Sequence, residues 1–284
     1  MTASISIIVP CYNQAIYLDD CLTSVLSQSY TNWECIIVND GSPDNTEDVA
    51  VSWCKKDHRF KYLRKENGGL SSARNAGIQL SQGTYILPLD ADDMIGKEYC
   101  EKAIQIFERN DTVKVVYAEA EFFGEQTGIW KLPPYRLSDL ALDNMIYCSA
   151  FFRKSDFQSY GGYDESFLFG MEDWDLWLGL LINGGDVVKL PDVEFFYRIK
   201  EISMTTNLRV NHQAQVATRN QLYLKHNHFY LKEFGDALKV FNERKKLRAE
   251  LDYAHAQIVE IYNSYTFRLG SLMLKPLRFL KGKK

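Results

Sequence analysis

The sequence predicts an α/β protein built on a doubly wound sheet, because apolar β-branched runs alternate with segments of helical spacing along its first hundred residues. Strands that are separated by helices in this rhythm form a parallel sheet with helices on both faces. Acidic residues follow two of the runs, and ligands bind such sheets beyond the carboxyl ends of the strands. We therefore expect a ligand site at that edge of the sheet.

Local patterns predict each element of this first half. Ile5 to Val9 is a β-branched run that Pro10 ends, which is typical of a buried strand. The segment from Tyr17 to Leu26 carries apolar residues at helical spacing. On the same grounds, we expect strands at 5–9, 35–38, 60–63 and 85–89, and helices at 17–26, 44–56 and 71–80.

The second half has a more mixed pattern, so the sheet is expected to be mixed overall. Its expected elements are strands at 113–123, 147–152, 187–190 and 193–199 and a helix at 173–182. Beyond Asn207 the pattern is helical. From Val240 onward, apolar residues step by four and three in an a/d heptad seam that consists of Leu247, Leu251, Ala254, Ile258 and Ile261.

These patterns divide the chain into a globular domain, 1–207, and a C-terminal helical extension with a coiled-coil seam, 208–284. The composition, with 46% hydrophobic and 25% charged residues, is that of an ordinary folded protein. A formal net charge of -4 argues against a general nucleic-acid binder, so no nucleic-acid partner is expected.

The compartment that we expect is the cytoplasm. The six cysteines are scattered and form no CxxC pair, which favours free thiols in a reducing environment. No signal-peptide pattern precedes the first strand, and no apolar run reaches the ~18 residues that a membrane span needs.

The cluster Asp90-Ala91-Asp92-Asp93 stands directly after the fourth expected strand. Carboxylates that lie this close repel one another and need a cation to share, and oxygen ligands suit hard ions such as Mg2+ or Mn2+. Short acidic loops are also common as solvated turns. The position after a strand, together with Asp40 at the end of another strand, favours a functional site.

Seven segments also share their order and spacing with one known family. They are 7–13 (IIVPCYN), 38–42 (VNDGS), 67–70 (NGGL), 73–77 (ARNAG), 89–93 (LDADD), 162–165 (GYDE) and 172–175 (EDWD). On these motifs, which cover roughly residues 4–200, the chain resembles a family 2 glycosyltransferase with the GT-A fold.

The resemblance implies a Rossmann-like nucleotide-binding half at about 1–110 and an acceptor half at about 111–207. It implies transfer of a sugar, with inversion, from a UDP- or dTDP-linked donor to an acceptor hydroxyl. The acceptor would be a saccharide or a lipid-linked molecule. Assembly of a surface polysaccharide or glycoconjugate is the expected context by analogy with the family.

The donor-binding residues also follow from the resemblance. Asp40 would accept a hydrogen bond from the N3–H of uracil or thymine. The remaining positions are Pro10, Tyr12 and Asn13 in the nucleotide pocket, Asn67 and Arg74 near the base and the diphosphate, Asp90 and Ala91 on the ribose side, and Arg198 at the diphosphate. For Arg74 the alternative is a solvated arginine on a helix surface.

The chemical roles are assigned in the same way. Asp92 would ligate Mn2+ or Mg2+, which neutralises the charge on the departing diphosphate, and Asp93 would support that site. Asp173 would be the general base, with Glu172 beside it in the family's acidic motif. Acidic residues also stabilise the start of a helix, which remains an alternative for Glu172. No late histidine stands out as a further ligand, since His212 follows the core pattern.

Three other functions are alternatives to this one. A sugar-nucleotidyltransferase should carry a Gly-rich basic loop after the first strand, whereas this chain has Pro10-Cys11-Tyr12-Asn13 there. An oxidoreductase of the Rossmann type would need GxGxxG at that place. A catalytically inactive scaffold that acts through its C-terminal helix is the third, and the retained Asp40, Asp92 and Asp173 argue against it.

The tail from Tyr265 combines six basic residues with large apolar ones and has no acidic residue. Such a segment favours peripheral contact with an anionic membrane, here on its cytoplasmic face. The heptad seam predicts a homodimer, and the two expectations are compatible.

Overall fold

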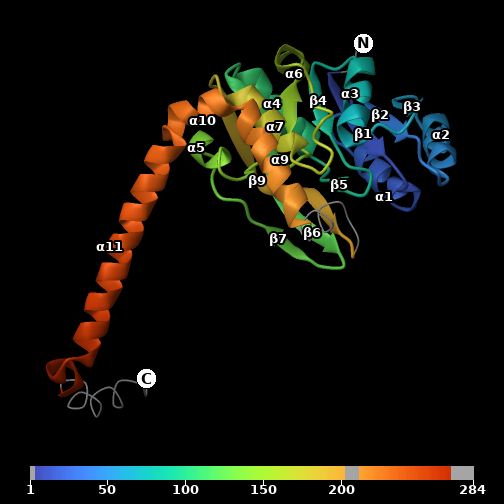
Figure 1. The fold of residues 1–284 in the computed structure, drawn as a ribbon. Coiled ribbons are helices and arrows are strands. Elements are labelled where there is room, and N and C mark those ends of the chain that lie inside the picture. Colours follow the sequence, from blue (N-terminus) through green and yellow to red (C-terminus); the bar gives the residue numbers. More distant parts are fainter. Residues whose placement is uncertain (1–3, 202–210, 270–284) are drawn as a thin grey trace. The chain divides into compact units, whose positions relative to one another are not determined.

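The computed structural model describes residues 4–201 and 211–269 (Figure 1). The strands of this described part form one sheet with the order β3-β2-β1-β4-β8-β6-β9-β5, and the short strand β7 pairs with β6. The first four strands in this order are parallel to one another, and both antiparallel and parallel pairs follow. The expected doubly wound, mixed sheet is therefore confirmed.

The parallel half agrees closely with the pattern read from the sequence. Every residue of β1 and β2 is buried, and this includes the polar Ser6, Glu34, Asn39 and Asp40. Helix α3 packs against β1 and β2, and α1 packs against α2. The elements are β1 (Ile5–Cys11), α1 (Ala15–Leu26), β2 (Trp33–Asp40), α2 (Thr46–Lys56), β3 (Phe60–Lys65), α3 (Leu70–Leu80) and β4 (Tyr85–Pro88).

The second half differs from the expectation in several elements. The two strands expected at 187–190 and 193–199 form one strand, β9, whose register against β6 shifts near Pro191, a residue that has no amide hydrogen to donate. The strand expected at 147–152 is only the short β8. Helix α4 was not expected, although its buried residues have helical spacing: Tyr99, Cys100, Ala103, Ile104 and Phe107.

The bounds in this half are β5 (Met94–Ile95), α4 (Tyr99–Arg109), β6 (Val113–Gly124), β7 (Gly128–Trp130), α5 (Leu137–Leu140), β8 (Phe151–Arg153), α6 (Lys154–Tyr160), α7 (Glu172–Leu181) and β9 (Asp186–Ile199). Strand β6 is antiparallel to β8 and parallel to β9. The short β5 pairs with β9, which brings the end of β9 beside the turn that follows β4.

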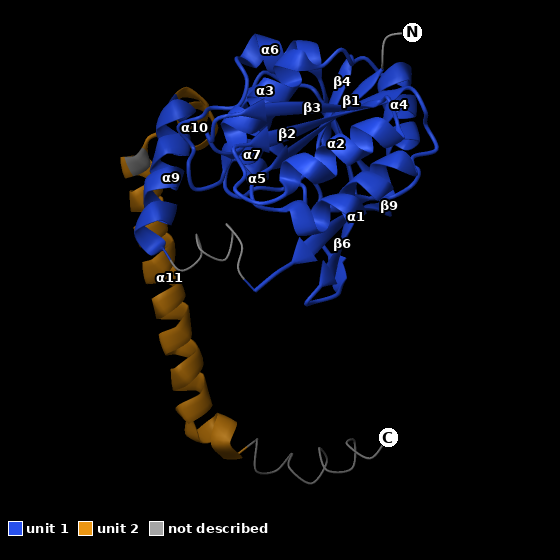
Figure 2. Cartoon of the chain, turned by 90° about the vertical axis from the view of Figure 1, so that its right-hand side faces the viewer, with its two compact units in different colours: residues 1–227 blue, residues 228–284 orange. Residues whose placement is uncertain are grey.

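The chain divides into two compact units, residues 1–227 and 228–284 (Figure 2). Helix α9 (His212–Lys225) falls in the first unit, although the sequence placed it in an extension that starts at 208. The physical reason is an anchor at its end, where Lys225 and His226 both bind the buried carboxylate of Asp175 on α7.

The second unit contains the helices α10 (Asn227–Phe234), which begins at the boundary, and α11 (Ala237–Asn263). Within residues 4–201 and 211–269, no helix combines the length and apolar character that crossing a membrane requires. Most of the basic tail that was predicted to contact a membrane, from residue 270 on, lies outside the described residues.

Gly77 sets how closely α3 approaches the sheet. A Cβ atom at this position would lie 2.6 Å from Cγ2 of Ile8 and 2.9 Å from Cγ2 of Val38. Both are β-branched side chains with little rotamer freedom, so the strands or the helix would have to shift. The close packing of α3 on β1 and β2 therefore depends on a glycine.

We expect Gly77→Ala to lower the free energy of unfolding. Overpacking a core position costs about 1–3 kcal/mol, and the better helix propensity of alanine, worth about 1 kcal/mol, offsets only part of it. Urea unfolding measures the change, with the exposed Gln79→Ala on the same helix as control. A Gly77→Ala protein as stable as the control would contradict this packing.

Candidate active site

A cavity of about 720 Å³ opens at the carboxyl ends of the parallel strands. Its walls come from the segments after β1, β2, β3 and β4, together with the loop before α7 and the start of α9. Eight of the residues predicted from the sequence line it: Pro10, Tyr12, Asp40, Asn67, Asp90, Ala91, Asp92 and Glu172. This edge of the sheet is where ligands of doubly wound folds bind.

Asp40, at the end of β2, shapes the wall of the cavity. Its carboxylate accepts hydrogen bonds from the backbone N–H groups of Gly68 (3.0 Å) and Gly69 (2.8 Å) and pairs with Lys65 Nζ (2.6 Å). The side chain of Asn67 donates to the backbone carbonyl of Asp40 (2.9 Å). These bonds hold the Asn67–Gly69 loop against β2.

Arg74 lies on the buried face of α3 and is only 1% exposed, which excludes the solvated surface arginine. It donates to Asp90 Oδ1 and to Glu172 Oε1, both at 2.7 Å, and its guanidinium lies 5.3 Å from the ring centre of Tyr163. Burial alone would lower the pKa of Arg74, but its anionic neighbours, Asp90 foremost, raise it well above the ordinary value. Arg74 thus stays charged and joins the turn after β4 to the start of α7.

Asp93 is buried in the turn that follows β4. Its Oδ1 accepts from the backbone N–H of Arg198 (2.8 Å), while its Oδ2 has no hydrogen-bond partner within the described residues. Burial, together with the charges of Asp92 and Asp90, raises the pKa of Asp93 well above its usual range. A buried, unpartnered carboxylate oxygen of this kind fits a cation site.

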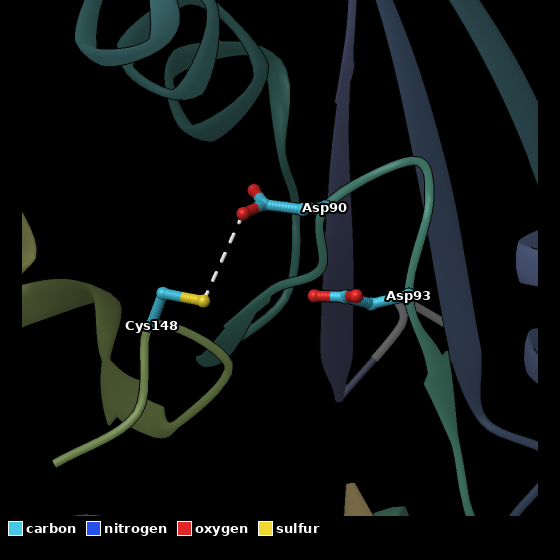
Figure 3. Close-up of side chains that lie close together, drawn as sticks. All are labelled: Asp90, Asp93 and Cys148. Carbon is cyan, nitrogen blue, oxygen red and sulfur yellow. Dashed lines mark hydrogen bonds between the residues drawn. The ribbon is translucent and has the colours of Figure 1, made fainter. Parts of the chain in front are cut away.

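Ligand atoms of Asp90, Asp93 and Cys148 lie within 4.8 Å of one another (Figure 3). The Cys148 thiol donates to Asp90 Oδ2 at 3.8 Å, and burial raises its pKa, which disfavours the thiolate that metals bind. The carboxylates rather than the sulfur therefore fit a hard cation such as Mg2+ or Mn2+. Asp92, the ligand predicted from the sequence, has its carboxylate in contact with Lys200 Nζ.

Asp173 stands in the first turn of α7, and the residue is partly exposed. Its Oδ2 accepts from Asn144 Nδ2 (3.0 Å) and its Oδ1 from the backbone N–H of Trp174 (2.7 Å). The pKa of Asp173 is raised to about 7, mainly by burial of the carboxyl group and secondly by the nearby charge of Glu172. A carboxyl group that titrates near neutral pH is suited to accept and release a proton.

The three acidic residues at the start of α7 therefore have three different environments. Glu172 is committed to Arg74, whereas Asp173 is held by neutral donors. Asp175 is fully buried, and its carboxylate forms hydrogen bonds with Tyr160, Lys225 and His226. The sequence could not show these environments, because most of the partners come from distant segments of the chain.

Some predicted residues lie beside the cavity rather than in its wall. Asn13 has φ = 55° and is exposed, and it lines an adjoining cavity of about 590 Å³ together with Arg198 and Lys200. Arg198 donates from Nε to the backbone carbonyl of Asp92 (2.8 Å) and pairs with Asp20 (2.8 Å). Arg74 and Asp173 are likewise absent from the wall of the larger cavity.

Several contributions to the cavity were not found from the sequence, among them Lys200, the loop before α7 and the start of α9. Lys200 lines both cavities. The sequence feature that could have pointed to it is its alternation with Arg198 at the end of a strand. The loop before α7 adds Phe167, Leu168 and Phe169 to the rim, and two of these apolar side chains are exposed.

The parallel half-sheet, with an acidic turn after β4 and an acidic start of α7, agrees with the GT-A fold that the resemblance implies. Residues 6–164, more than half of the chain, match the family model described as glycosyl transferase family 2. The chain belongs to this family.

Relatives and solved structures agree with this assignment. The minor teichoic acid biosynthesis protein GgaB of Bacillus subtilis is 29% identical over 261 residues, which is 87% of this chain and 28% of GgaB. The chain spans about a third of the length of two other relatives from that organism. Curated relatives such as these are therefore much longer than the segment that they share with it.

The structure of S. aureus TarS 1-349 in complex with UDP-GlcNAc matches with a TM-score of 0.63 and 19% identity, over 82% of this chain and 73% of that one. The mannosyltransferase PcManGT from Pyrobaculum calidifontis, in complex with GDP-Man and Mn2+, matches with a TM-score of 0.59 and 16% identity, over 100% and 89%. At these identities the likeness shows a shared GT-A fold.

We expect Arg74→Met to destabilise the protein by about 3–5 kcal/mol, because it leaves the buried carboxylate of Glu172 and the partly buried one of Asp90 without their cation. The matched control is Arg64→Met, which breaks the exposed pair between Arg64 and Glu47. Solvent-exposed ion pairs contribute about 1 kcal/mol or less to the free energy of unfolding. The free energies of unfolding in urea give both values, and equal losses for the two variants would show that Arg74 is not the structural link described here.

Proposed function

We propose that this glycosyltransferase moves a sugar from a UDP- or dTDP-sugar to an acceptor hydroxyl, with inversion and with the help of a divalent cation. The observation that carries the proposal is the pair of hydrogen bonds that Arg74 donates, one to Asp90 and one to Glu172. They link the acidic turn at the floor of the cavity to the helix turn that carries Asp173. This link supports our proposal that the donor-binding turn and the base belong to one site.

The donor nucleotide is proposed to lie in the larger cavity, between the segments after β1 and β3. Asp40 Oδ2 accepts a hydrogen bond from Gly69, and a carboxylate oxygen can accept a second one. The N3–H of uracil or thymine is such a donor, whereas guanine and adenine present a different edge. TarS was solved in complex with UDP-GlcNAc and PcManGT with GDP-Man, so nucleotide sugars bind to proteins that share this fold.

Asp92 is proposed as a ligand of Mn2+ or Mg2+, together with Asp90 and the unpartnered oxygen of Asp93. Such a cation would neutralise charge that grows on the departing diphosphate. In the structure Lys200 contacts Asp92, so this contact has to open when Asp92 turns to a cation. Lys200 and Arg198 then remain beside the cavity as positive charges for the diphosphate.

The reaction needs one base that removes the proton of the attacking hydroxyl. Glu172 is unsuited to this role, because its carboxylate is bound to a guanidinium that stays charged. Asp173 accepts its hydrogen bonds from neutral N–H groups, and its pKa of about 7 leaves a large fraction deprotonated at neutral pH. A single displacement with Asp173 as the base inverts the anomeric configuration.

The biological context is proposed to be the assembly of a cell-surface polysaccharide or glycoconjugate at the cytoplasmic face of the membrane. Support comes from GgaB, whose name refers to minor teichoic acid biosynthesis. The acceptor would be a saccharide or a lipid-linked saccharide, and the basic tail beyond residue 269 would bring the protein to the membrane.

We expect Asp173→Asn to lower turnover by about 10²-fold or more, because general-base help is lost, while the affinity for UDP stays close to that of the wild type. The substitution should not weaken the fold. A raised carboxyl pKa in the native state costs stability as pH rises from the ordinary value of 3.8 towards 7, so above pH about 7 the amide should be as stable as the wild type or more so.

Single-turnover assays, UDP calorimetry and urea unfolding measure the three quantities, with Asn144→Ala as a milder variant that removes one donor to Asp173. Wild-type turnover in Asp173→Asn would remove Asp173 as the base. A product with retained anomeric configuration by NMR would exclude the single displacement.

We expect EDTA to abolish transfer and Mn2+ or Mg2+ to restore it, and Asp92→Asn to weaken the response to added metal. The matched control is Asp20→Asn, which removes the partner of Arg198 at the rim without touching the acidic turn. Mn2+ binding, measured by electron paramagnetic resonance, should be weaker in Asp92→Asn than in the wild type and unchanged in Asp20→Asn. Full activity in EDTA would contradict the role of the cation.

A further inference from the structure

Helix α11 presents an apolar stripe whose side chains are exposed among the described residues of its own unit. The helix runs unbroken through 27 residues, roughly 40 Å, and is capped by Asp236, whose side chain accepts from the backbone N–H of Lys239 (Figure 1). Large apolar side chains are exposed along the stripe, from 43% at Val240 to 65% at Leu247. A contiguous exposed apolar surface of this kind marks a site of association.

The stripe has the geometry of a coiled-coil seam. With Leu251 and Ile258 at heptad position a, position d is filled by Val240, Leu247, Ala254 and Ile261. The only interruption between Val240 and Ile261 is Arg244, at another a position. A single polar residue at position a is a known device that fixes the register and the number of strands.

The charges beside the seam indicate which way the second helix runs. In a parallel pair, position g of one helix faces position e of the next heptad on the other. Those pairs are Glu243 with Arg248, which have opposite charges, and Glu250 with His255, whose ring can hydrogen-bond to the carboxylate, so neither glutamate faces another acidic side chain. In an antiparallel pair, g faces g and e faces e, which places Glu243 and Glu250 against each other and leaves the basic residues together.

Arg244 fits the parallel arrangement as well. Position a borders position g of the partner helix, so the guanidinium of Arg244 can reach Glu243 of a second copy in the same register. The carboxylate of Glu243 therefore offsets the free-energy cost of placing the charge of Arg244 at the seam. The face away from the seam is polar or small at most positions, including Lys245, Asp252 and Ala256.

We propose that α11 forms a parallel, two-stranded coiled coil with a second copy of this chain. The protein is then a homodimer joined through residues 240–261. All the residues that line the two cavities lie in the first compact unit, so each chain keeps a complete site. Two such sites on one dimer would raise the effective concentration of a long acceptor that carries several reactive hydroxyl groups.

Sedimentation velocity of the full chain tests the association. The wild type should sediment as a dimer that dissociates on dilution, and Ile258→Asp, at position a, should be monomeric with unchanged turnover per chain. Val259→Asp is the matched control, because it places the same charge on the next residue, on the outer face. A monomeric wild type, or a dimeric Ile258→Asp, would overturn the proposal.

Cysteine cross-linking tests the direction. In a parallel, in-register dimer the two copies of Ile261→Cys face each other at position d and should form an interchain disulfide under mild oxidation. Val259→Cys, on the outer face, and the wild type, with its own six cysteines, should not. In an antiparallel pair the two substituted positions would lie about 30 Å apart. A dimer in which Ile261→Cys fails to cross-link would therefore disprove the parallel arrangement.

Discussion

A fully buried guanidinium is the constraint on which the site depends. Arg74 is inaccessible to water, and a buried cation without a partner would cost several kcal/mol, so the fold must bring carboxylates to it. The two that meet it come from the turn after β4 and from the first residue of α7. Because Gly77 lets α3 lie close against β1 and β2, the position of Arg74 relative to the sheet is fixed in turn.

The ion pair between Arg74 and Glu172 helps to explain how neighbouring acidic residues acquire different chemistry. Glu172 neutralises Arg74 and so fixes the start of α7, while Asp173, one residue later, points to Asn144 and keeps a pKa near neutrality. Asp175 is buried beneath Lys225 and His226 and holds α9, whose first turn borders the larger cavity. Asp173 and Asp175 are the same residue type, and it is their surroundings that make one a candidate base and the other a structural anchor.

Local patterns in the sequence were sufficient for the parallel half of the sheet and for the strand-end positions of Asp40 and Asp90. They could not show contacts between distant segments. Arginine is a residue type that is usually exposed on helices, and the partner Glu172 that accounts for the burial of Arg74 is 98 positions away in the chain. The contact of Lys200 with Asp92 and the bond of Asn144 to Asp173 are long-range in the same sense. Strand ends and motifs pointed to candidate site residues, whereas the contacts that give these residues different environments could be seen only in the fold.

The central claim is that Asp173 works as a base whose environment sets its pKa near 7, and the pH dependence of kcat tests it most directly. The base acts in its deprotonated form, so kcat should fall as pH decreases through about 7 and reach a plateau above it. An acid limb with an apparent pKa near 7 is the predicted result. A kcat that stays constant across this region, in a protein shown to remain folded, would contradict the account.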